Sequence, residues 1–212
     1  MNLNKKKDLA LLFRKLTHGV YVIGVADNDQ YNAFTAAWVI HVSFNPLMLA
    51  LSINPNHSSY RMIQSSKLFS VNVLHRDQLD LARHFGNPSN SDKLANIKWH
   101  RGQTGAPILD HALAYFECEM KHECQAGDHK LVIGHVIDGA ILDSELSPLL
   151  YSDTGDMDGS HDLYPDTFRF FVYGHKKIKS VSIVINLMLK TYGDPTGTGL
   201  ELCCFAARPA SV

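Results

Sequence analysis

Small side chains stand next to one large aromatic ring in a segment that otherwise has the composition of β-structure. Residues 32–54 are rich in apolar and β-branched residues, and Thr35, Ala36 and Ala37 come directly before Trp38. Small side chains leave the main chain uncovered, so a flat ligand could lie against backbone N–H groups at close range. A tightly packed crossing of strands would use the same small residues. The segment by itself leaves both interpretations open.

One histidine lies where two predicted strands meet. His129 follows Gly127-Asp128, a typical turn pair, so we expect its imidazole near the surface at the rim of the strands. A histidine in such a turn is usually just solvated. A chemical role for it needs support from other parts of the chain.

Two serines stand where a helix is expected to begin. Ser58 and Ser59 follow turn-forming residues and precede a run with helical features. Free N–H groups and the helix dipole make such a terminus suitable for an anion. Ordinary helix capping is the commoner role of these residue types, so this segment also leaves two interpretations open.

The composition limits the classes of protein to which the chain can belong. Its 212 residues, 45% of them hydrophobic, suffice for one core, so we expect one domain plus a tail. The 20 basic and 21 acidic side chains give a net charge of −1, which argues against a nucleic-acid partner. The N-terminus lacks the apolar run of a signal peptide, and the apolar run at residues 180–189 is shorter than the ~20 residues that span a membrane. We therefore expect a cytoplasmic protein without a membrane segment.

Several kinds of catalytic or metal site are disfavoured. The 12 histidines form no HxxxH or HExxH pair and the 4 cysteines lack zinc-site spacing, so no metal site is expected. The chain has no GxSxG motif, which argues against hydrolysis. It also has no GxGxxG motif after a strand, which disfavours a Rossmann fold.

The elements predicted from the sequence are mainly strands. Hairpin-linked strands with few helices indicate a mainly β fold, a β-barrel with a few short helices. The last predicted helix would turn Leu79 and Leu81 towards the core, and residues 86–105 would form a long outer loop. Helices are expected over residues 5–16, from residue 58 and over 77–85, and strands over 19–26, 47–53, 67–74, 112–122 and 130–141, with one more between the turn at 27–30 and Pro46.

Several short segments, in this order and spacing, resemble the flavin reductase family, whose fold is the FMN-binding split β-barrel. The resemblance runs from about Asp8 to about Phe171, and several segments in register are more specific than any single short motif. It implies a homodimer that binds FMN, sometimes FAD, and moves a hydride from NADH or NADPH to the flavin. The segments are Thr35–Trp38, Phe69–Leu74, Leu81–Gly86, Ser91–Lys93, Ala126–His129 and Leu131–Val136.

The resemblance also implies roles for individual residues. The flavin ring would lie against Thr35, Ala36, Ala37 and Trp38, with polar groups supplied near it. The phosphate would lie at the predicted helix start, with a charge added by Lys93. His129 would position the reductant and is the candidate catalytic residue. The remaining cofactor-binding candidates are Ser52, Asn54 and Asn72 near the ring, Ser58 and Ser59 at the phosphate, and the corner His84, Phe85 and Gly86, of which Phe85 could equally belong to the core.

The sequence thus predicts an NAD(P)H-dependent flavin reductase in residues 1–171, which passes electrons to an oxygenase or another separate acceptor. Residues 172–212 form a tail of unknown role that matches nothing recognisable, and the segment beyond Tyr192 is expected to be disordered. Two alternatives stay open. The same barrel could be a non-catalytic flavin or haem carrier, or a purely structural interaction module.

Overall fold

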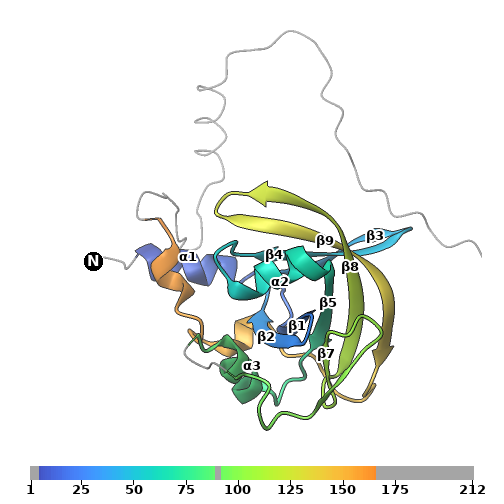
Figure 1. Cartoon of the computed structure of the whole chain (residues 1–212). Helices are drawn as coiled ribbons and strands as arrows, with labels where there is room; N and C mark the ends of the chain where they lie inside the picture. The colour runs from blue at the N-terminus through green and yellow to red at the C-terminus, as the bar shows by residue number, and fades with distance from the viewer. Residues whose placement is uncertain (1–4, 89–91, 166–212) are drawn as a thin grey trace, which may run out of the picture. The chain divides into compact units, whose positions relative to one another are not determined.

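Seven antiparallel strands form the main sheet of this computed structural model, which describes residues 5–88 and 92–165. Their order is β2-β1-β5-β8-β9-β4-β3, and β6 and β7 form a separate pair (Figure 1). The mainly β fold predicted from the sequence is confirmed. The strands are β1 (Tyr21–Asp27), β2 (Gln30–Ala36), β3 (Val39–Phe44), β4 (Leu47–Ile53), β5 (Leu68–Val73), β6 (Trp99–Arg101), β7 (Pro107–Leu109), β8 (Ala114–Ala126) and β9 (His129–Ile141), and the helices are α1 (Lys5–Phe13), α2 (Ser58–Ser66) and α3 (Leu79–Gly86), with 3₁₀ turns η1 (Tyr151–Thr154) and η2 (Ser160–Leu163).

The long hairpin of β8 and β9 curls the sheet. The first half of β8 pairs with β5, whereas the first half of β9 pairs with β4. The register of the hairpin shifts between Glu117 and Cys118 and again between Met120 and His122, and such bulges bend strands. Gly127 opens the two-residue turn with a φ of 62°, which favours glycine. The turn therefore places His129 at one end of the curled sheet.

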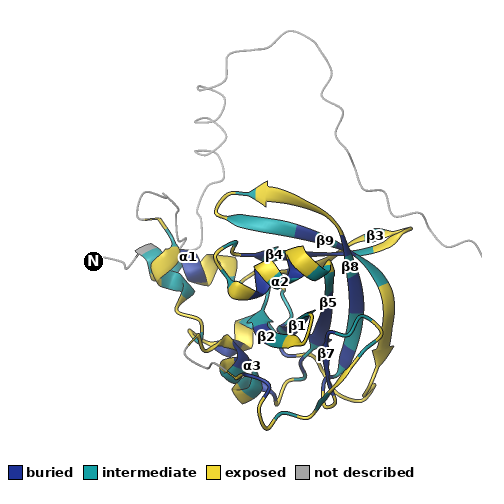
Figure 2. Ribbon diagram, in the orientation of Figure 1, coloured by how far each residue is buried: buried dark blue, intermediate teal, exposed yellow. Residues whose placement is uncertain are grey.

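Apolar side chains from both ends of the sheet meet in one core. Ile23, Leu51, Phe69 and Val132 are fully or almost fully buried there, and α2 adds Tyr60 and Ile63 (Figure 2). Burial of such side chains is the main force that favours folding. A second cluster lies under α3 and contains Val20, Leu74, Ala82, Phe85 and Leu149.

Three local predictions need correction. The first helix ends at Phe13 instead of residue 16, and Leu11, Leu12 and Phe13 are exposed. Helix α3 buries Ala82 and Phe85, whereas Leu79 and Leu81 are only half-buried. Ala82 and Phe85 are three residues apart, so they lie on the same face of the helix, and this face packs on the core. The segment after α3 is not a plain outer loop, since it contains β6 and buries Lys93 and Leu94.

Asn72 lies in the core, away from the cavity described below. Its side-chain nitrogen donates to Val22 O at 3.0 Å and Pro107 O at 3.2 Å, and its side-chain oxygen accepts from Leu109 N at 2.8 Å. A buried amide must be bonded on both sides, and here it ties β5 to β1 and β7. The prediction that Asn72 lies near the ring of a ligand is replaced by this structural role.

Candidate functional site

Most of the candidate residues line one cavity of about 440 Å³. Its walls come from the link between β2 and β3, the end of β4, the end of α3 and the start of β9. The structure thus brings together segments more than 90 residues apart in the chain, from Thr35 to His129. The predicted residues that line this cavity are Thr35, Ala36, Ala37, Trp38, Ser52, Asn54, Phe85, Gly86, Lys93 and His129.

Small side chains form one wall of the cavity and are held in place by neighbouring elements. The hydroxyl of Thr35 donates to Ala82 O at 2.6 Å, which joins β2 to α3. Ser52 N donates to Trp38 O at 2.9 Å, which fixes the chain just after the small residues. Gly86 faces this wall, and a Cβ there would lie 3.8 Å from the Thr35 side chain. The result is a wall with uncovered main chain that a planar group can approach closely.

His129 lies at the rim of the cavity beside Trp38. Its ring centre is 5.1 Å from that of the indole, at an angle of 57°. Nδ1 donates to the carboxylate of Asp128 at 2.8 Å. This hydrogen bond and the nearby imidazole charge lower the pKa of the Asp128 carboxyl. The carboxylate and the indole together orient the imidazole, and Trp38 itself stays 43% exposed at the mouth.

Lys93 gives the cavity a buried positive charge. Its side chain is 8% exposed, and Nζ donates to Phe85 O at 2.7 Å. Within residues 5–88 and 92–165 no carboxylate forms an ion pair with it. Burial lowers the pKa of the Lys93 ammonium group. A buried charge that faces a cavity without a counter-ion favours an anionic ligand.

His57 is a cavity residue that the sequence did not suggest. It caps α2, because its Nδ1 accepts from Ser59 N at 3.2 Å. An imidazole that accepts at Nδ1 carries its proton on Nε2, which is therefore a donor. Burial and the charge of Lys93 lower the pKa of His57, so the neutral form is favoured. Histidine is not among the usual cap residues, and its position just before the predicted helix was the available signal.

The remaining candidates support the cavity from outside. Ser58 is exposed, and Ser59 is buried with its hydroxyl accepting from Asn32 Nδ2 at 3.1 Å. Neither serine lines the cavity, and His57 takes the capping role expected of them. His84 Nε2 donates to Lys93 O at 2.7 Å, which holds the segment that carries the ammonium group.

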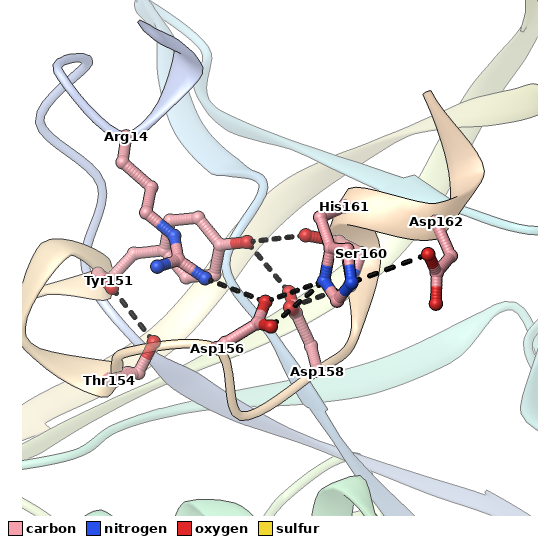
Figure 3. Close-up of polar contacts among 8 residues, drawn as sticks. All are labelled: Arg14, Tyr151, Thr154, Asp156, Asp158, Ser160, His161 and Asp162. Carbon is pink, nitrogen blue, oxygen red and sulfur yellow. Dashed lines mark hydrogen bonds and ion pairs between the residues drawn. The ribbon is translucent and has the colours of Figure 1, made fainter. Parts of the chain in front are cut away.

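A segment near the end of the described chain completes the cavity wall. This closing segment, residues 150–163, contributes Tyr151, Asp158, Ser160 and Leu163. Figure 3 shows how Arg14, which follows α1, pairs with Asp156 at 3.3 Å, while His161 contacts the same carboxylate at 2.9 Å. None of these side chains was among the residues predicted from the sequence.

The chain is similar to several known proteins. The model of the flavin reductase like domain matches residues 13–160. A high molecular weight rubredoxin of Moorella thermoacetica is 32% identical over 78% of this chain and 72% of its own length. Component B of nitrilotriacetate monooxygenase from Mycobacterium thermoresistibile is 26% identical, with a TM-score of 0.65 over 69% of this chain and 82% of that structure. An NADH:FAD oxidoreductase of Streptomyces globisporus is 25% identical, with a TM-score of 0.65 over 73% and 93%.

The chain spans between 22% and 45% of the length of several other curated relatives. In the described residues no helix is long and apolar enough to cross a membrane. The same residues contain no cluster of three metal-ligating side chains.

We predict that His57 makes stability depend on pH. The lowered pKa means that the folded chain resists protonation at His57, so stability is fully present above the unfolded value of about 6.5 and is lost as pH falls below it. His57→Asn should keep the cap and flatten the fall in Tm between about pH 6.5 and 5, whereas His57→Ala should lose the cap at about 0.5–2 kcal/mol. Calorimetry across this pH range measures both effects. A fall of equal steepness in His57→Asn and the wild type would contradict the assignment.

Proposed function

The chain belongs to the flavin reductase-like family, as its sequence and split β-barrel fold predicted, and we propose that it is an FMN-dependent reductase that oxidises NADH or NADPH. FAD is the alternative flavin. The observation that carries the proposal is one cavity with a small-residue wall and a buried ammonium group without a carboxylate partner in the described chain. The cytoplasmic location of the protein stays a prediction.

The residues present suit FMN. A flat ring fits the wall at Thr35, Ala36 and Ala37, with the Trp38 indole at its edge. A phosphate fits beside Lys93 and His57, since both residues line this cavity and the ammonium group and the Nε2 donor both suit an anion. Ser52 and Asn54 add polar atoms at the end of β4. The cavity therefore offers the apolar, polar and cationic contacts that FMN requires.

Side chains have a limited task in such a reaction. When bound, the flavin supplies an acceptor for the hydride of the nicotinamide, so the protein needs to align two rings and exclude water. His129 lies at the rim, where it can orient a second ring through Nε2, and Asp128 holds its imidazole. We infer that His129 positions the reductant without transferring a proton.

We predict that His129→Ala leaves the FMN dissociation constant nearly unchanged and slows flavin reduction by NADH or NADPH about two- to tenfold, the effect of one lost hydrogen bond. Stopped-flow absorbance of the FMN-loaded chain measures the rate. Lys130→Ala, one residue further along β9 and outside the cavity lining, is the matched control and should reduce flavin at the wild-type rate.

Two outcomes would contradict this account. A wild-type chain that binds FMN but oxidises neither nucleotide would be a flavin carrier, and a haem spectrum after purification would identify a haem carrier. Loss of FMN binding in His129→Ala would make His129 a direct flavin contact.

The electron acceptor is proposed to be a separate oxygenase. The similar protein of Mycobacterium thermoresistibile is one component of a monooxygenase. A reductase of this kind hands reduced flavin or electrons to a second protein. The acceptor of this chain is thus expected to be a protein that uses reduced flavin.

We also propose that the chain forms a homodimer through β3 and its neighbours. β3 is an edge strand with a register shift between His41 and Ser43, and its apolar residues Ile40, Val42 and Phe44 are all exposed, Phe44 to 89% (Figure 2). Ile137, Ile141 and Leu142 are also exposed on or just after β9. A large exposed apolar patch marks an interface, and a second copy of the chain supplies a matching apolar surface.

We predict that Phe44→Asp shifts the chain from dimer to monomer in sedimentation equilibrium, because a carboxylate would have to be desolvated at the apolar interface. Leu11→Asp, at an exposed leucine of α1, is the control and should remain dimeric. A wild-type monomer, or a Phe44→Asp dimer of unchanged affinity, would place the interface elsewhere.

A further inference from the structure

A second cavity of about 410 Å³ adjoins the one assigned to flavin. The two cavities share six lining residues: Thr35, Ala37, Gly86, Pro88, Tyr151 and Asp158. This side cavity extends past the end of α3 and does not include Lys93 or His57. A molecule stacked on a ring in the first cavity could therefore continue into the second.

Asp158 places an oriented carboxylate on the wall shared by the two cavities. Oδ2 accepts from the Tyr151 hydroxyl at 2.6 Å, and Oδ1 accepts from Ser160 N at 3.0 Å (Figure 3). Partial burial opposes its ionisation, but the hydrogen bonds from Tyr151 and Ser160 and the charge of Arg14 outweigh this and lower the pKa of the carboxyl. A carboxylate has about four acceptor positions, so these donors orient it without saturating it.

The shared wall belongs to a segment that has only short 3₁₀ turns, but contacts with other parts of the chain hold it in place. Tyr151 N donates to His18 O at 2.8 Å, and the Arg14 guanidinium lies 5.8 Å from the Tyr151 ring centre. Asp156, two residues before Asp158, carries the ion pair with Arg14. The position of Asp158 is thus set by its own hydrogen bonds and by the contacts of its neighbours in the closing segment.

Arg83 adds a cation to the lining of the side cavity. It belongs to α3, and its guanidinium pairs with Asp80 at 2.9 Å, with 55% of the Arg83 side chain and 94% of the Asp80 side chain exposed. Exposed pairs of this kind contribute little and exchange partners readily. The side cavity therefore holds an acceptor for hydroxyl groups and an available partner for a phosphate.

We propose that the side cavity binds the ribose and phosphate part of the nicotinamide nucleotide, with Asp158 accepting the ribose hydroxyls and Arg83 contacting the phosphate. The assignment rests on the proposed reductase function. Vicinal hydroxyls of ribose are a preferred partner of carboxylates in nucleotide sites. Asp158 is then a residue that binds and positions the reductant.

The flavin side chain is the other possible source of hydroxyl groups. The cationic end of the first cavity, at Lys93 and His57, accounts for the FMN phosphate, and these residues lie outside the side-cavity lining. A carboxylate beside that phosphate would repel it. The ribose of the second reactant is therefore the better partner of Asp158.

ADP-ribose tests the proposal without any hydride transfer. It contains the ribose and phosphate groups but no nicotinamide, and its affinity for the FMN-saturated chain can be measured by calorimetry. Asp158→Asn should weaken ADP-ribose about three- to tenfold, as expected for a lost charge-assisted hydrogen bond, and should raise the KM for the preferred nucleotide by a similar factor with kcat unchanged. Arg83→Gln should also weaken ADP-ribose. Asp153→Asn, which changes an exposed carboxylate of the same segment outside both cavities, is the matched control and should bind ADP-ribose as the wild type does.

Each other result would overturn the proposal. No binding of ADP-ribose to the FMN-loaded wild type, or equal binding by Asp158→Asn, removes the ribose site. A weaker FMN affinity in Asp158→Asn with unchanged ADP-ribose binding assigns the carboxylate to the flavin chain. Failure of the proposed reductase function would give a different result, because the chain would then bind ADP-ribose without oxidising NADH or NADPH.

Discussion

A buried ammonium group without a carboxylate partner in the described chain sets the polarity of the whole cavity. Lys93 is held by the carbonyl of Phe85 at the end of α3, and Lys93 O in turn accepts from His84. Desolvation makes such a charge costly unless an anion joins it. The charge of Lys93 also lowers the pKa of the capping histidine of α2, and the cavity combines these two nitrogen groups with a wall of small residues.

An acidic group of the site comes from a different part of the chain. Asp158 and Tyr151 reach the cavities from the closing segment, which Arg14 connects to the N-terminal helix region. The linings of the two adjoining cavities thus carry both positive and negative groups. An arrangement of this kind can hold two ligands in a fixed relative orientation, which is the main requirement for hydride transfer between rings.

The sequence predicted those features that depend on local pattern. Turn residues and β-branched runs gave the hairpins, and the small residues at Thr35–Ala37 lie on the cavity wall as expected. Asn72 could not be placed, because a polar residue in a strand can face a ligand or bond inside the core, and only the position of β7 decides between them. His57 and Asp158 were missed for a related reason. Their importance comes from the chain folding back over distant segments, and their own neighbours in sequence give no sign of it. The predicted tail at residues 172–212 lies outside the described residues.

The central claim is that Lys93 makes this cavity a site for a phosphorylated flavin, and paired titrations of FMN and riboflavin test it most directly. Lys93→Met keeps a long apolar stem and removes the charge. The account predicts that this variant binds FMN about ten- to a hundredfold more weakly than the wild type does and binds riboflavin with unchanged affinity, because only FMN carries the anion. Equal losses for the two ligands, or unchanged FMN affinity, would contradict the account.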